Sequence, residues 1–246
     1  MDDEAQLVAQ VALEATAEAC SVSGLTDAWR TLIQDVYSAN LDRYEPDELG
    51  DTPLTLGIQC SDNLKTRAIR RFALEDNEPT DRHWHIDGLH VSSPGNTLTF
   101  SLGSTRVVTM KTPFSAGRTP LWDHIGDWEQ DSQIRLSIAT ENSRVLAYQT
   151  HPTSAFTLFP HSGCPGVVRN YMLLWAGEPD SPSTAGWLGI PVLGDSAFIA
   201  RKQLWWDEVP TQIPTKTRSN RGPHFDERRA AAPEVTLKQR RRDGQA

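Results

Sequence analysis

The sequence predicts a mainly β protein with N-terminal helices. A first observation is a series of six or seven short β-like runs after Arg82, separated by glycine, proline, asparagine and serine. A second is that most of these runs have no helical apolar pattern between them, which is typical of an antiparallel sandwich or barrel. A third is that apolar residues recur with helical spacing in the first forty residues.

Residues 1–81 are predicted to form a helical region that supports the rest of the chain. The segment 5–20 is rich in alanine, its leucine and valine residues share one helical face, and Gly24 follows it as a breaker. A second helix begins near Thr26 or Asp27, either of which can cap it. Its apolar stripe repeats at intervals of three and four residues and consists of Trp29, Leu32, Ile33, Val36 and Tyr37.

A polar loop with Pro46 and Pro53 comes next, and a short basic helix follows it. Ser61 is a plausible N-cap for this helix, because a serine hydroxyl can accept a hydrogen bond from a free N–H of the first turn.

Residues 82–213 are predicted to form the core, with a C-terminal packing segment after Gly177. Residues 214–246 are basic and poor in large apolar side chains, so we expect a disordered tail. The predicted strands of the core are 82–91, 96–103, 105–111, 133–140, 143–150, 155–159 and 167–177.

Charge and cysteine usage narrow the class of protein. The net charge is −8, and the nine basic and four acidic residues from Lys216 onward leave −13 on the body. An acidic body argues against broad, charge-driven binding to nucleic acid or anionic membranes. The three cysteines, Cys20, Cys60 and Cys164, are far apart, which fits neither a disulfide framework nor a zinc ribbon. Without a signal peptide or a long apolar run, we expect a soluble cytoplasmic protein and no membrane partner.

The stretch "RHWHIDGLHV" concentrates three histidines and one aspartate in ten residues. In an extended conformation His83, His85 and Asp87 would point to one face, since side chains alternate along a strand. Imidazole and carboxylate groups on one face are suited to binding a metal ion.

Two further residues lie at the far end of the β region, His161 and, eight positions later, Arg169. Two ligands from one strand and a distant histidine can occupy one face of an octahedral Fe(II), leaving three positions open. A guanidinium at the start of the last predicted strand could hold a dicarboxylate through its fork of donors.

These residues resemble the Fe(II)- and 2-oxoglutarate-dependent dioxygenases, over roughly residues 82–177. In that family an H-x-D pair, a distal histidine and an arginine follow one another, and His85, Asp87, His161 and Arg169 have this order. The resemblance implies a double-stranded β-helix (jelly-roll) core and an oxidoreductase with iron and 2-oxoglutarate as cofactors. It also implies that Arg169 binds 2-oxoglutarate and that Tyr171 is a second donor to its carboxylate.

Other assignments of the ligands stay open in the sequence. His151 also lies within the family's spacing for the distal ligand, and His83 shares the predicted strand face of His85. Arg169 could instead form a surface ion pair.

The sequence leaves the substrate class open between a small molecule, a protein side chain and nucleic acid. The segment after His85 and Asp87 resembles that of nucleic-acid demethylases of the AlkB type. That group has a second arginine six residues after the first, where this chain has Trp175. The alternative from another class is a non-enzymatic, cupin-like or lectin-like binding or structural module with the same strands.

Overall fold

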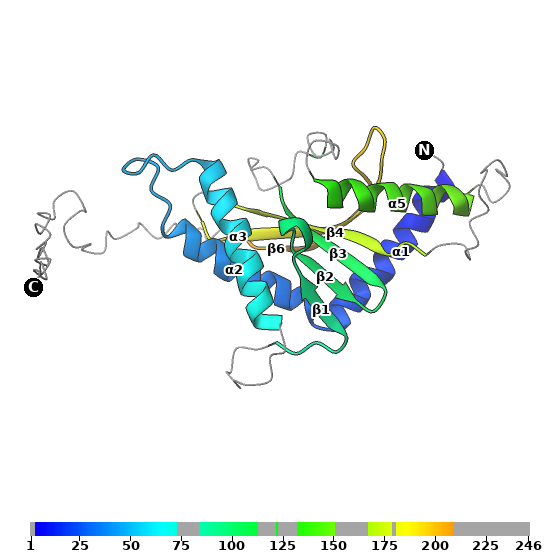
Figure 1. Ribbon diagram of the computed structural model, residues 1–246, viewed down its shortest axis with the longest axis horizontal. Coiled ribbons are helices and arrows are strands. Elements are labelled where there is room, and N and C mark those ends of the chain that lie inside the picture. The colour runs from blue at the N-terminus through cyan, green and yellow to red at the C-terminus, as the bar shows by residue number, and fades with distance from the viewer. Residues whose placement is uncertain are drawn as a thin grey trace, which may run out of the picture. The chain divides into compact units, whose positions relative to one another are not determined.

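The computed structural model describes residues 3–72, 84–112, 122, 132–150, 167–178 and 181–208 (Figure 1). For residues 148–150 it describes the backbone alone. The chain divides into one unit at 1–211 and a second at 212–246, and every described residue belongs to the first. His83, His151, His161 and the predicted tail lie outside the described residues. The predicted division into three parts stays a prediction.

Six strands form one mixed sheet, in the same order in space as in the chain. All neighbours are antiparallel except β3 and β4, which run parallel. The sheet is therefore two three-stranded meanders joined along one parallel pair. The strands are β1 (Leu89–Ser92), β2 (Thr99–Leu102), β3 (Thr105–Lys111), β4 (Asn170–Gly177), β5 (Thr184–Pro191) and β6 (Phe198–Trp206).

Helix α5 (Gln133–Thr150) lies between β3 and β4 in the chain, as a parallel pair requires a crossover connection. The prediction of strands at 133–140 and 143–150 was wrong. Alternating Ile134, Leu136 and Ile138 suggested a strand, and a buried amide concealed the helical stripe. That amide is Asn142, whose Nδ2 donates to the carbonyls of Asn170 and Pro191 at 2.9 Å each.

Helices cover both faces of the sheet. The N-terminal helices pack on the face that carries Phe100, Val107, Leu173 and Trp175, with α3 over β1 and β3 and with α1 and α2 over the β5 and β6 side. The opposite face buries a second set against α5 and Trp122, which includes Val108, Met110, Met172, Leu174 and Trp187. The expected combination of a sheet with N-terminal helices is present. The described strands form one sheet, so a double-stranded β-helix is not confirmed.

The three N-terminal helices are α1 (Asp3–Val22), α2 (Leu25–Leu41) and α3 (Pro53–Phe72). The first two agree with the predicted segments, but the N-cap of α2 is Gly24, so the prediction of a cap at Thr26 or Asp27 was wrong. Helix α3 begins at Pro53, so the prediction of a cap at Ser61 was wrong and Ser61 lies inside the helix. Thr52 Oγ1 instead accepts from the backbone N–H of Thr55 at 3.2 Å, and proline suits the first helical position because its missing N–H would be unpaired there.

Strands β5 and β6 lie in the segment that the sequence predicted only to pack on the core. All eight residues of β5 are buried, which removes the alternation of polar and apolar residues that marks a half-exposed strand. Gly186 on β5 lies opposite Trp205 on β6, and a Cβ at this glycine would overlap the indole ring. Gly186 thus makes room for the tryptophan of the neighbouring strand.

No helix in the described part of the chain is long and apolar enough to cross a membrane.

Candidate functional site

His85 and Asp87 do contact each other, although neither lies on a strand. Strand β1 begins only at Leu89, and a turn at Asp87 and Gly88 precedes it. His85 Nε2 is 2.8 Å from Asp87 Oδ1, and the two side chains are 62% and 98% exposed. No group of three or more histidine, cysteine, aspartate or glutamate side chains within the described ranges could hold a metal ion. The described site therefore consists of two ligand types on an open surface.

The sheet topology brings His85, Asp87 and Arg169 to one end of the sheet. The register pairs Leu89 at the start of β1 with the end of β2, and the start of β3 with the start of β4. Arg169 is exposed, and its carbonyl accepts from the N–H of Arg106 on β3 at 2.7 Å. Strands β1 and β4 are three positions apart in the sheet, about 14 Å at the usual spacing.

Tyr171 lies in the core, on the face covered by the N-terminal helices. Its ring is 1% exposed, and its hydroxyl donates to the carbonyls of Ala12 at 3.3 Å and Val168 at 3.2 Å. Burial raises the pKa of this phenol. The hydroxyl thus links α1 to the start of β4, and the predicted contact with 2-oxoglutarate stays a prediction.

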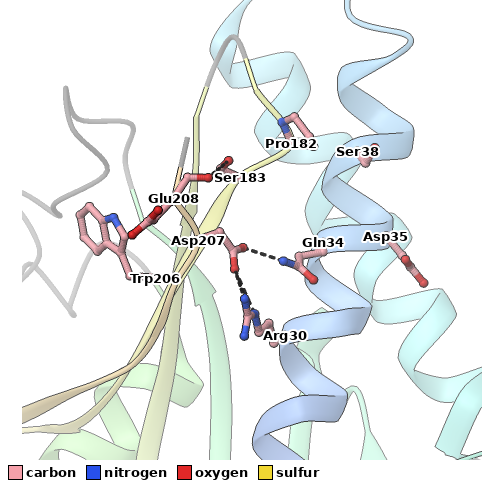
Figure 2. A pocket seen from close by; sticks show the side chains of 9 residues that line it. All are labelled: Arg30, Gln34, Asp35, Ser38, Pro182, Ser183, Trp206, Asp207 and Glu208. Atoms are coloured by element: carbon pink, nitrogen blue, oxygen red, sulfur yellow. Dashed lines mark hydrogen bonds and ion pairs between the residues drawn. The ribbon is translucent and has the colours of Figure 1, made fainter. Parts of the chain in front are cut away.

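A cleft lies between α2, the start of β5 and the end of β6 (Figure 2). Its volume is about 570 Å³, and we call it the α2–β6 cleft. Figure 2 shows Arg30 and Gln34 pointing from α2 toward Asp207, with Ser38 and Pro182 higher along the walls. The lining residues are Arg30, Gln34, Asp35, Ser38, Pro182, Ser183, Trp206, Asp207 and Glu208.

Asp207 ties the two walls of this cleft together. Its Oδ1 accepts from Arg30 Nε at 3.0 Å and Nη2 at 2.6 Å, both from α2. Its Oδ2 accepts from Gln34 at 2.7 Å and from the Thr184 hydroxyl and N–H at 2.8 and 3.0 Å. The Trp205 indole donates in turn to the Thr184 hydroxyl at 3.1 Å. The network therefore spans α2, the start of β5 and the end of β6.

The protonation state of Asp207 follows from these contacts. Burial raises the pKa of the Asp207 carboxyl, while hydrogen bonds from Thr184, Gln34 and Arg30 lower it by more, so the pKa lies below its ordinary value of 3.8. A carboxylate that is ionised at neutral pH and accepts from five donors is suited to positioning other groups rather than to proton transfer.

The remaining charges make the cleft acidic. Asp35, Asp207 and Glu208 oppose the single guanidinium of Arg30, which leaves a formal charge of −2 on the lining. Asp35 is paired with Arg71 at 2.8 Å. No ion pair with the Glu208 carboxylate is found among the described residues, and this residue is exposed.

Sequence reasoning did not find the α2–β6 cleft. Arg30 and Asp207 are 177 residues apart, so no local spacing connects them. The signal that was present is a pair of acidic residues directly after two tryptophans, in "LWWDE". A carboxylate next to buried aromatic residues needs donors nearby, but the sequence does not say which residues supply them.

Comparisons with known proteins found no match. No family model matches the chain, and neither a curated protein nor a solved structure is significantly similar to it.

Proposed function

We propose that the protein is a binding module that holds a cationic group in the α2–β6 cleft. The observation that carries this proposal is the Asp207 network, which fixes both walls of the cleft through five hydrogen bonds. Walls that are already ordered lose little conformational entropy when a ligand binds. A volume of about 570 Å³ is also within the usual range for small-molecule sites.

The charge of the lining favours a cation. Asp207 already has its partner in Arg30, and Asp35 is paired with Arg71. Glu208, whose carboxylate points toward Trp206 at the rim of the cleft in Figure 2, is the lining carboxylate that remains for a new ionic hydrogen bond. Charge-assisted hydrogen bonds are stronger than neutral ones, and an ammonium or guanidinium group can form them with Glu208. The ligand class is therefore an amine or a guanidine, either as a free small molecule or as a basic side chain of a peptide.

Calorimetric titration with spermidine, with arginine amide and with a lysine-rich peptide tests the proposal and distinguishes these sources. We expect saturable binding of at least one probe. Glu208→Gln should weaken it by up to about five-fold, because an ion pair with an exposed carboxylate contributes roughly 0.2 to 1 kcal/mol.

Glu18→Gln is the matched control, because Glu18 is exposed on α1 and does not line the cleft. Equal affinities of the Glu208 and Glu18 variants would reject the proposal. An absence of saturable binding for all three probes would reject it too.

The second candidate is the Fe(II)- and 2-oxoglutarate-dependent dioxygenase. It is supported by the contact between His85 and Asp87 and by the position of Arg169 at the same end of the sheet. Iron would be held by His85, Asp87 and His161, and Arg169 would bind the 2-oxoglutarate carboxylate. The bound iron would supply the oxidation of the substrate, which is a small molecule, a protein side chain or, as in AlkB-type demethylases, nucleic acid.

Adding Fe(II) and 2-oxoglutarate without oxygen tests this candidate through the weak visible absorption band of their complex. We expect the band in the wild type and its loss in His85→Ala, Asp87→Ala and His161→Ala, with His151→Ala as a variant that keeps it. Retention in His161→Ala with loss in His151→Ala would move the third ligand to His151. Absence of the band in the wild type would reject the dioxygenase.

Arg169→Lys tests the cosubstrate contact separately from iron binding. The lysine cannot form two parallel hydrogen bonds, so 2-oxoglutarate affinity should fall about ten-fold to a hundred-fold while iron affinity stays unchanged. Unchanged 2-oxoglutarate affinity would make Arg169 a surface residue without this role.

A further inference from the structure

Three polar side chains form a row across the first three strands. Ser101 on β2 lies directly opposite His90 on β1 and, on its other side, directly opposite Arg106 on β3. Residues in such positions have Cβ atoms roughly 5 Å apart, so the row extends over about 10 Å.

All three side chains lie on the face of the sheet opposite the N-terminal helices. The neighbouring positions Val91, Phe100 and Val107 contribute to the core on the helical side. Because side chains alternate along a strand, His90, Ser101 and Arg106 point the other way. Helix α5 packs on that face mainly over β4 and β5, and His90 is exposed.

Arg106 is the unusual member of the row. Its side chain is partly buried, and its Nε is fully buried without a hydrogen-bond partner. Among the described residues no hydrogen bond or ion pair of this guanidinium is found. A partly buried cation without a counter-charge is costly, and a bound anion would remove that cost.

The surroundings favour an anion as this partner. Arg169 adds a second positive charge at the same end of the sheet, where its carbonyl accepts from the Arg106 N–H. Asp87, three residues before His90, is already in contact with His85. The short side chain of Ser101 leaves space between the two longer ones, so donors from all three residues can converge above it.

We infer that His90, Ser101 and Arg106 form a binding site for an oxyanion, a phosphate or a carboxylate group. The guanidinium offers parallel donors to two oxygens of the anion, and the hydroxyl and the imidazole add single donors. The site is on the other face of the sheet from the α2–β6 cleft and does not depend on the function proposed for that cleft.

Backbone amide NMR titration with inorganic phosphate, and separately with sodium acetate, tests this site in the full chain. We expect saturable shifts at His90, Ser101 and Arg106, and the anion with the higher affinity identifies the group. Arg106→Met keeps the length of the side chain and should lower affinity about ten-fold or more. Arg67→Met is the control, because Arg67 is exposed on α3 and lies outside the row.

If Arg106→Met does not fold, two further variants test the anion site. His90→Ala and Ser101→Ala alter an exposed and a partly buried residue, and each should weaken the anion several-fold. The inference is overturned if neither anion gives saturable shifts at these three amides. It is equally overturned if the variants of the row bind as tightly as Arg67→Met.

Discussion

The aromatic ring of Tyr37 on α2 lies directly on the backbone of Gly177 at the end of β4. A Cβ at this glycine would overlap the ring carbons of Tyr37, and the Tyr37 hydroxyl donates to the carbonyl of the next residue, Glu178. The ring also packs edge-on against Trp175, with centroids 6.1 Å apart. Helix α2 can therefore approach the sheet this closely only because position 177 has no side chain.

Gly177→Ala should destabilise the protein by about 1 to 3 kcal/mol. The added methyl group has no space beside the buried ring, so either the ring or the helix must move. Urea unfolding followed by circular dichroism measures the change.

Gly57→Ala provides a contrast with the same chemical change. Gly57 lies inside α3, and its Cβ would meet Lys111 Cδ at 3.9 Å, an ordinary contact. Alanine is more favourable than glycine within a helix, so we expect this variant to be more stable by roughly 0.5 to 1 kcal/mol. Similar effects of the two substitutions would contradict the packing described for Tyr37.

Asp207→Asn should destabilise the protein by about 2 kcal/mol at neutral pH, because the ionised carboxylate accepts stronger hydrogen bonds than an amide oxygen and pairs with Arg30. The pKa of Asp207 is lowered in the folded state, so its contribution is complete above the unfolded value near 3.8 and is lost as the pH falls through the folded value. The difference in unfolding free energy between wild type and variant should therefore be constant above about pH 5 and shrink below pH 3.8. A difference that does not vary with pH would contradict the lowered pKa.

Cys20 and Cys60 should resist alkylation in the native protein. They are 2% and 0% exposed, and burial raises the pKa of each thiol to about 11. The thiolate is the reactive form, so at pH 8 both inaccessibility and protonation protect them. Mass spectrometry of iodoacetamide-treated Cys164→Ser protein should show no modification until denaturant is added. Rapid labelling in native buffer would show that these helices open easily.

Tyr171→Phe distinguishes the structural use of this hydroxyl from its predicted role with 2-oxoglutarate. Removing the contacts with Ala12 and Val168 should lower the unfolding free energy by about 1 kcal/mol. The predicted contact with the cosubstrate would in addition lower 2-oxoglutarate affinity, whereas a purely structural hydroxyl would leave that affinity unchanged. Reduced 2-oxoglutarate affinity with unchanged stability would contradict the structural role and support the predicted cosubstrate contact.

The sequence predicted elements well where one face is buried and the other is exposed. The stripe from Trp29 to Tyr37 has this form, and α2 is present where it was expected. The prediction was wrong for α5, because Asn142 occupies a buried position of its stripe and its partners are backbone carbonyls from distant strands. Strand β5 gave no signal because it is buried on both faces.

The candidate sites also differ in how far the sequence alone can predict them. His85 and Asp87 could be found because they are two residues apart, and their contact is local. The Arg30–Asp207 pair and the row through Ser101 depend on how distant segments align. Burial then leaves particular groups, such as Arg106 Nε, without partners, and a sequence does not show this.

The parallel seam between β3 and β4 has a consequence for how the chain folds. Arg106 and Asn170 pair across 64 residues, whereas the other strand pairs of the described sheet are joined by short connections. Closing a long loop costs more entropy than closing a hairpin, so we expect each three-stranded half to form early and the seam to close late. Until then β3 and β4 are both open sheet edges, available to strands of other molecules. Aggregation during refolding should therefore depend more on the rate of seam closure than on the stability of either half.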